Sequence, residues 1–444
     1  MSVLDSLRSL APSRADYRAV PRTWKSDALA GLTVGIVALP LALAFGVSSG
    51  VGAQAGLITA VVAGFLAAVF GGSNVQVSGP TGAMVVVLAP IVAAHGAAAV
   101  VMVGLLAGFI VVLMGVLKLG RSIDFIPWAV LEGFTLGIAV IIFMQQVPAA
   151  VGSPHFTEST NASVSAWLAV SAAISAAGTS AASVVVASSA SVLVWSIASV
   201  AGVVLIMVLA ARWIKLVPGS ILAIVVVTVV AELATAPLAR IGELPSSLGS
   251  PSWPDFRGVN VAALLGPALT VAALAAIESL LSARVAAEMA PTGDINPDRE
   301  LVGQGIASIG SALFGGMPAT GAIARTAVNV RSGGRTRLAA IVHAAVLLGV
   351  VYLATGPVSR IPLAALAGVL MVTAARMIPL HAIRGIFRTL GSSTVVFIVT
   401  ALITVTFDLV LAVVLGVVLS YIASRWQRHR HITRQTVSSA EASE

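Results

Sequence analysis

The stretch FGGMPATGAIARTAVNVRSGGRT, residues 314–336, decides how this chain folds. It lies between long apolar segments, yet its glycines and Pro318 interrupt any helix running through it, and Arg325 adds a permanent charge. If these segments cross a membrane, the interruption survives only where protein or a watery cavity covers the backbone. The stretch therefore predicts a short helix that begins near Ala322 and faces a polar site.

The composition indicates an integral membrane protein. Of the 444 residues, 58% are hydrophobic and 9% are charged, and the mean hydropathy is +1.04. About a quarter of the residues of a soluble domain are charged, so we expect this chain to lie in a lipid bilayer. The chain has no cysteine, which excludes disulfides and cysteine catalysis.

Apolar segments follow one another along the chain and predict an all-α polytopic membrane protein with fourteen spans. A helix needs about 20 apolar residues to cross a bilayer, and two of the segments, 81–94 and 322–334, are half-length. The stretch 155–189 predicts an external loop with one interfacial helix. The full-length segments are 28–47, 53–70, 97–117, 124–147, 190–211, 217–235, 262–284, 301–315, 338–355, 361–375, 391–407 and 408–424.

The basic residues predict the orientation of the spans. With the N-terminus in the cytoplasm, 21 of the 25 Lys and Arg residues fall on the inner side and three on the outer side, as the positive-inside rule requires. Arg325 is the one basic residue that falls on neither side, because it lies within a predicted span. We therefore expect a multi-pass protein of the cell inner (plasma) membrane with both termini in the cytoplasm. The same distribution explains the net charge of +8 without a nucleic-acid partner.

Three pairs of short motifs indicate an internal repeat. IPWAVLEG (126–133) resembles IPLAALAG (361–368), and the FGG and TGA triplets each recur in the same order. Seven spans per copy would insert the second copy upside down, as in secondary transporters. The predicted organisation is a cytoplasmic tail (1–27), a first repeat (28–235), an external linker (236–261), a second repeat (262–424) and a basic tail (425–444).

Glycine, proline and threonine precede both half-length helices, in 71–84 and 315–325. We expect a short strand before each, NVQVS (74–78) in the first, and helices that begin near Thr81 and Ala322. Inversion would point the two N-termini at each other, and each offers unpaired N–H groups and about half a positive charge. This arrangement predicts an anion site.

The charge of Arg325 fits an anion site, although a cation in the first turn opposes the helix dipole and is costly in hydrocarbon. A bound anion would remove both objections. The alternative is that Arg325 reaches a surface or pairs with a carboxylate, such as Glu278. Glu278 and Glu132 fall within predicted spans, and Glu278 is the preferred group for coupling to a proton or a cation. Its alternative is a buried ion pair with Arg325 or Arg284.

No catalytic motif competes with transport. The six histidines lack metal-ligand spacing, and the glycine clusters lack the Lys-Ser/Thr ending of a P-loop. We expect neither an enzyme nor a cofactor, apart from Na⁺ or H⁺ as coupling ion.

Three stretches carry a family resemblance: 38–73, 77–84 (VSGPTGAM) and 296–336 (NPDRELVGQGIASIGSALFGGMPATGAIARTAVNVRSGGRT). They resemble the SulP (sulfate permease) family of anion transporters over residues 25–424. The resemblance implies a 7+7 inverted repeat with a core domain (helices 1–4 and 8–11) and a gate domain (helices 5–7 and 12–14). It also implies elevator-type movement of the core and a homodimer.

The resemblance also implies a set of site residues. Phe45 would line the site, Glu278 and Ser282 would serve ion coupling, and the starts of helices 3 and 10 would bind the anion. Leu41 replaces a residue that is polar in many relatives, and the family's STAS domain is absent from this chain. The residues at the two helix starts are Thr81, Gly82 and Ala83, and Gly321, Ala322, Ile323, Ala324 and Arg325.

The expected function is secondary transport of a small anion (bicarbonate, sulfate or a dicarboxylate), coupled to H⁺ or Na⁺. Leu41 slightly favours a small inorganic anion. Two alternatives stay open: an uncoupled anion exchanger or channel, and a nucleobase permease of the same fold.

Overall fold

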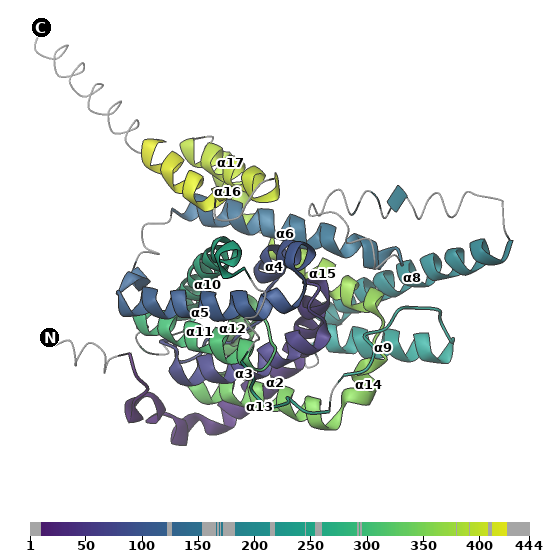
Figure 1. Cartoon of the computed structure of the whole chain (residues 1–444), viewed down its shortest axis with the longest axis horizontal. Coiled ribbons are helices and arrows are strands. Elements are labelled where there is room, and N and C mark those ends of the chain that lie inside the picture. The colour runs from purple at the N-terminus through teal and green to yellow at the C-terminus, as the bar shows by residue number, and fades with distance from the viewer. Residues whose placement is uncertain are drawn as a thin grey trace, which may run out of the picture. The chain divides into compact units, whose positions relative to one another are not determined.

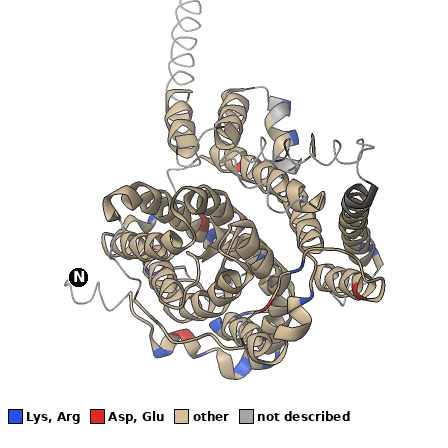
Figure 2. Ribbon diagram, turned by 45° about the vertical axis from the view of Figure 1, so that its right-hand side comes forward, with Lys and Arg blue, Asp and Glu red and all other residues tan. Residues whose placement is uncertain are grey.

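The structure is a computed structural model, and helices make up most of what it describes (Figure 1). Six of the described helices are long and apolar enough to cross a membrane, and charged residues are sparse along them (Figure 2). The described residues are 10–121, 127–152, 166, 168, 170–171, 183–213, 218–244, 246–253, 260–290, 293, 295–378, 380–389, 391–406 and 411–423.

The helices that the structure describes cover most of the predicted spans, while the number of membrane crossings stays a prediction. Asp408, most of the predicted loop (155–189) and the basic tail (425–444) lie outside the described residues, and helix α8 already begins at Ser183, within that predicted loop. The helices are η1 Arg14–Tyr17, α2 Val20–Ser48, α3 Ala53–Phe70, α4 Gly82–His95, α5 Ala98–Val116, α6 Trp128–Ala150, α8 Ser183–Trp213, α9 Gly219–Leu233, α10 Val261–Met289, α11 Pro297–Leu313, α12 Ile323–Arg331, α13 Arg337–Leu353, α14 Thr355–Ser359, α15 Leu363–Met377, α16 Leu380–Thr389, α17 Ser392–Thr406 and a last helix, Leu411–Ala423.

The chain divides into two compact units. The first comprises Met1–Arg121 and Ile142–Thr373, and the second Ser122–Ile141 and Ala374–Glu444. Within the first, α11 packs against α5 and α3, and α13 packs against α2 and α3 (Figure 1). Within the second, α16 packs against α17. These units are not the predicted repeats or the core and gate domains, which stay predictions.

Small residues let the helices of the first unit approach closely. A Cβ on Gly305 of α11 would lie 2.6 Å from the carbonyl oxygen of Gly108 in α5, and a Cβ on Gly108 would lie 2.8 Å from that of Gly305. Neither contact distance leaves room for a side chain. Close backbone contact through glycine is typical of helices packed within a membrane.

Two short strands join the halves of the chain. Strand β1 (Ser78–Gly79) pairs antiparallel with β2 (Thr320–Gly321), with Ser78 opposite Gly321 and Gly79 opposite Thr320. The first strand therefore overlaps the predicted strand (74–78) only at Ser78, and it is shorter. Helices α4 and α12 begin just after β1 and β2, with Thr81 and Ala322 as their N-caps, where the sequence placed the helix starts.

The two TGA triplets occupy different positions in the fold. In the first half, Thr81 caps α4, and Gly82 and Ala83 form its first turn. In the second half, the triplet supplies β2 and the N-cap of α12. Aligning the triplets therefore misaligns the two helix starts by two residues, because the second half uses its triplet for strand pairing.

Two further segments differ from their predicted boundaries. Helix α2 begins at Val20 rather than 28, and it includes Asp27, which is fully buried. The helix tolerates this carboxylate because Thr23, and the backbone and side chain of Thr336, donate hydrogen bonds to it. Helix α16 lies where a loop was expected; its arginines recur at helical spacing opposite apolar residues.

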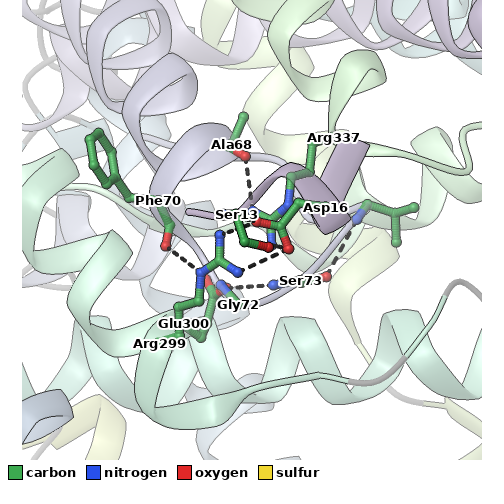
Figure 3. A network of polar contacts seen from close by, with 10 residues as sticks. Ser13, Asp16, Ala68, Phe70, Gly72, Ser73, Arg299, Glu300 and Arg337 are labelled. Atoms are coloured by element: carbon green, nitrogen blue, oxygen red, sulfur yellow. Dashed lines mark hydrogen bonds and ion pairs between the residues drawn. The ribbon is translucent and has the colours of Figure 1, made fainter. Parts of the chain in front are cut away.

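Asp16, which precedes the first long helix, contacts two arginines from later in the first unit (Figure 3). The two terminal nitrogens of Arg299 donate to its carboxylate at 3.1 and 2.9 Å, and Arg337 Nη2 lies 4.0 Å away. Burial raises the pKa of Asp16, but the bonds from Arg299 and the Ser13 N–H, with the two arginine charges, lower it below its ordinary 3.8.

We expect Asp16→Asn to lower the free energy of unfolding in detergent by about 1–3 kcal/mol at neutral pH, because the buried Arg299 loses one of its two acceptor oxygens and its counter-charge. A folded-state pKa below the unfolded one gives stability that is present above pH 3.8 and lost as the pH falls through the lower folded value. Thermal unfolding measured from pH 7 to pH 3 should therefore show the difference between wild type and variant shrinking at the acid end.

Glu288→Gln serves as the control. Glu288 pairs with Arg284 across an exposed surface of α10 at 3.7 Å, where such pairs contribute little. A variant at Asp16 as stable as this control at neutral pH would show that the tie to Arg299 does not stabilise the fold.

Candidate functional site

The candidate site lies where β1 leads into α4 and β2 leads into α12. Neither Thr81 nor Ala322 caps its helix with a side-chain hydrogen bond. Among the hydrogen bonds of the described residues, none engages the first-turn N–H groups of Gly82 or Ile323. Because the strands pair antiparallel, the two helix N-termini lie on either side of a two-residue ladder. Both positive helix ends are thus directed at one region.

Glu278 of α10 lies between the two strand-to-helix junctions. The hydroxyls of Thr81 and Thr320 each donate to Glu278 Oε2 at 2.7 Å, and the two hydroxyl oxygens lie 3.5 Å apart. One carboxylate oxygen therefore joins the two halves of the chain. The contact also places a negative charge beside the helix ends.

Arg325 lies in the first turn of α12 with 2% of its surface exposed. Its Nη2 donates to the carbonyl oxygen of Pro80 at 2.6 Å, whereas Nη1 has no hydrogen-bond partner in the described structure. Gly79, at φ +150°, leaves room for the guanidinium: a Cβ there would lie 2.7 Å from Nη1. The expected alternative, an ion pair with Glu278, is not formed between these described residues, although the charges are close enough to attract.

The other expected residues surround these groups to different degrees. Phe45 is 6% exposed and lies beside the start of α4, where a Cβ on Gly82 would meet its ring at 3.5 Å. Ser282 is buried and its hydroxyl lies 3.2 Å from that of Thr326, not on Glu278. Ala83, Gly321 and Ala322 are buried, Ile323 is partly buried and Ala324 is exposed.

Several groups at the site were not among the expected residues. Thr320 contacts Glu278 as Thr81 does, and its place in the second TGA triplet was a signal for it. Ser279 accepts the Gly321 N–H at 3.0 Å, and Thr326 accepts the Val77 N–H at 3.1 Å. These hydroxyls fix the backbone around the strands, and no sequence spacing marked them.

The remaining acidic residues are placed elsewhere. Glu132 belongs to the second unit and is 9% exposed, and Glu232 pairs with Arg240 at 2.8 Å. The described residues contain no cluster of three or more His, Asp or Glu side chains that could hold a metal ion.

The arrangement can bind a small anion. It presents two helix N-termini with unpaired N–H groups and a buried guanidinium nitrogen without an acceptor, which together favour negative charge. The adjacent Glu278 carboxylate, which accepts hydrogen bonds from two hydroxyls, could take up a proton or contribute oxygen ligands to a small cation.

Comparison with known proteins points the same way. A model of the sulfate permease family matches residues 24–401. The chain is 35% identical over 405 residues to the putative sulfate transporter YvdB of Bacillus subtilis (strain 168), covering 90% of this chain and 73% of that protein. It is 32% identical over 435 residues to the bicarbonate transporter BicA of a Picosynechococcus species, covering 95% and 74%.

Solved structures agree. The transmembrane domain of a cyanobacterium bicarbonate transporter BicA aligns with a TM-score of 0.76 at 30% identity, covering 88% of this chain and 98% of that one. The overall structure of SLC26A9 aligns with a TM-score of 0.77 at 16% identity, covering 96% and 69%, which shows a shared fold alone. The relatives are transporters and not enzymes, as expected from the sequence. The chain belongs to the sulfate permease family.

Proposed function

We propose that this protein is a secondary transporter of a small anion, which binds between the N-termini of α4 and α12 against Arg325. The observation that carries the proposal is the buried Arg325 guanidinium, whose Nη1 has no hydrogen-bond partner among the described residues. A buried charged donor left without an acceptor is costly, and an anion at the helix ends would satisfy it. Bicarbonate and sulfate are the first candidates, because the named relatives are a bicarbonate transporter and a putative sulfate transporter.

The nucleobase alternative has no support in these relatives. A neutral base would also leave the charge of Arg325 and both helix dipoles without a counter-charge. Leu41, which is apolar and 8% exposed, adds no polar group to the helix that carries Phe45. Both points favour a small inorganic anion over a larger polar molecule.

Glu278 is the proposed coupling group. An anion bound near a carboxylate repels its negative charge, so neutralisation of Glu278 by H⁺ or Na⁺ would favour anion binding, and the effect is reciprocal. The hydroxyls of Thr81 and Thr320 donate to the same oxygen of Glu278. Their oxygens would be further ligands for a cation bound there. This dependence of anion binding on the charge of Glu278 favours symport over an uncoupled exchanger or channel.

The larger-scale mechanism follows the family resemblance. We infer fourteen spans in a 7+7 inverted repeat, elevator-type movement of a core domain against a gate domain, and a homodimer in the cell inner membrane with both termini cytoplasmic. The antiparallel pairing of β1 with β2 supports the inversion, since the two half-helices then leave the ladder in opposite directions.

Arg325→Ala should raise the KM for anion uptake into proteoliposomes roughly 30-fold or more. Removing one partner of a buried charge pair costs about 2–5 kcal/mol. Arg331→Ala is the matched control, because Arg331 lies in the last turn of the same helix and is exposed. Wild-type uptake by the Arg325 variant, with a normal elution profile in detergent, would remove Arg325 from the site.

Glu278→Gln should abolish anion accumulation driven by an imposed pH or sodium gradient, while leaving downhill exchange measurable. The amide cannot be charged and then neutralised, so it uncouples the ion from the anion. Glu288→Gln, on the same helix but exposed, should accumulate anion as the wild type does.

A Glu278 variant that still concentrates the anion would place coupling elsewhere, with Glu132 as the next candidate. An anion current in wild type that ignores both pH and sodium would favour the uncoupled channel instead.

The orientation can be tested by cysteine labelling, because the chain has no native cysteine to interfere. A cysteine at Asn161, which lies outside the described residues, should react with an impermeant reagent added outside the cell. A cysteine at Arg384, exposed on α16, should react from the cytoplasmic side. Labelling of both from one side would refute the fourteen-span topology.

A further inference from the structure

Glu300, in the first turn of α11, is a buried carboxylate with an unusually complete set of partners. It is 2% exposed and accepts four hydrogen bonds. The backbone N–H groups of Gly72 and Ser73 donate to Oε2 at 2.8 and 3.2 Å. The side-chain amides of Gln76 and Gln304 donate to Oε1 at 2.8 and 3.0 Å.

Three of these donors belong to the segment that leads into β1. Gly72, Ser73 and Gln76 follow α3 directly, so Glu300 holds the chain between the end of that helix and the strand. Figure 3 shows the contacts to Gly72 and Ser73. The carboxylate thereby determines the path by which the backbone reaches the candidate anion site.

The fourth donor, Gln304, extends the contact to the strand itself. Its amide nitrogen also donates to the Ser78 hydroxyl in β1. The Gln76 amide packs against β2, because a Cβ on Gly321 would collide with it. Each strand of the ladder is therefore linked to Glu300 by one glutamine: β1 by Gln304 and β2 by Gln76.

A carboxylate suits this position. Four donors converge on the two oxygens of Glu300, and a carboxylate has enough lone pairs to accept all of them. A glutamine would offer one acceptor oxygen and would direct its own N–H groups at two of the donors. The negative charge is balanced nearby: Asp16 and Glu300 lie in one network with Arg299 and Arg337, two charges of each sign (Figure 3).

The site residues follow β1 without a break. Pro80, whose carbonyl accepts from Arg325, and Thr81, which donates to Glu278, come directly after Gly79. A shift of β1 would move both contacts together. In enzymes, a misplacement of about 1 Å can cost on the order of 100-fold in rate. By the same reasoning, moving both contacts away from the anion would weaken its binding.

We propose that Glu300 is a positioning residue for the anion site, acting with Gln76 and Gln304 to hold β1 in register with β2. The proposal rests on the proposed function, since it assumes that the anion binds at the ends of α4 and α12. Glu300 does not touch the anion; it sets where Thr81 and the acceptor of Arg325 lie.

The test compares Glu300→Gln and Gln304→Met with wild type in proteoliposomes, with uptake measured against bicarbonate or sulfate concentration per folded molecule. Gln304→Met removes the link to Ser78 but keeps three of the four bonds to Glu300. Both variants should raise KM about tenfold with a smaller change in maximal rate. A purely structural role would instead reduce the amount of folded protein and leave KM unchanged.

Asp298→Asn is the matched control. Asp298 lies in the same turn of α11, and its carboxylate accepts the Gly120 N–H at 2.9 Å, away from the strands. This variant should keep the wild-type KM. If Glu300→Gln does not fold, Gln304→Met decides the question, and a wild-type KM in that variant overturns the proposal.

Arg325→Ala in the same assay separates the two ideas. If Arg325→Ala keeps the wild-type KM, the anion does not bind at the proposed site, and the positioning role of Glu300 is refuted as well. If Arg325→Ala loses saturable uptake while Gln304→Met keeps the wild-type KM, the site stands and the positioning role of Glu300 is refuted.

Discussion

The pairing of β1 with β2 is the interaction on which the rest of the site depends. Backbone that is not helical within an apolar region must find hydrogen-bond partners inside the protein, and the two short strands supply them for each other. Their pairing brings two helix N-termini, the hydroxyls of Thr81 and Thr320, and the carboxylate of Glu278 into one place. The ladder thus fixes the backbone from which both half-helices begin.

The two segments that lead into the strands are anchored by different chemistry. The segment before β1 is held by the charged Glu300, within the network that includes Asp16 and Arg299. The segment before β2 is held by neutral hydroxyls: Thr59 Oγ1 accepts the Met317 N–H at 2.8 Å, and Ser311 donates to the Met317 carbonyl at 2.8 Å. The repeat symmetry suggested by the sequence does not extend to these supports.

The sequence predicted the features that arise from local pattern. Glycine and proline within an apolar run marked the helix starts at Thr81 and Ala322, and the isolated charge of Arg325 pointed to the candidate site, which stays a prediction. Long-range polar contacts left no such pattern: Glu300 binds Gly72, 228 positions away, and Asp16 binds Arg299, 283 positions away. Helix α16 was missed because its basic residues resembled a loop, although they recur at helical spacing.

Ligand-dependent thermal unfolding of the purified protein tests the central claim most directly. A ligand that binds only the native state stabilises it by mass action, by about 2.7 kcal/mol at a concentration 100 times Kd. With ionic strength and sodium held constant, bicarbonate or sulfate should raise the unfolding midpoint progressively with concentration, and uracil should not. Stabilisation by uracil with no response to any small anion would contradict an anion site at the ends of α4 and α12.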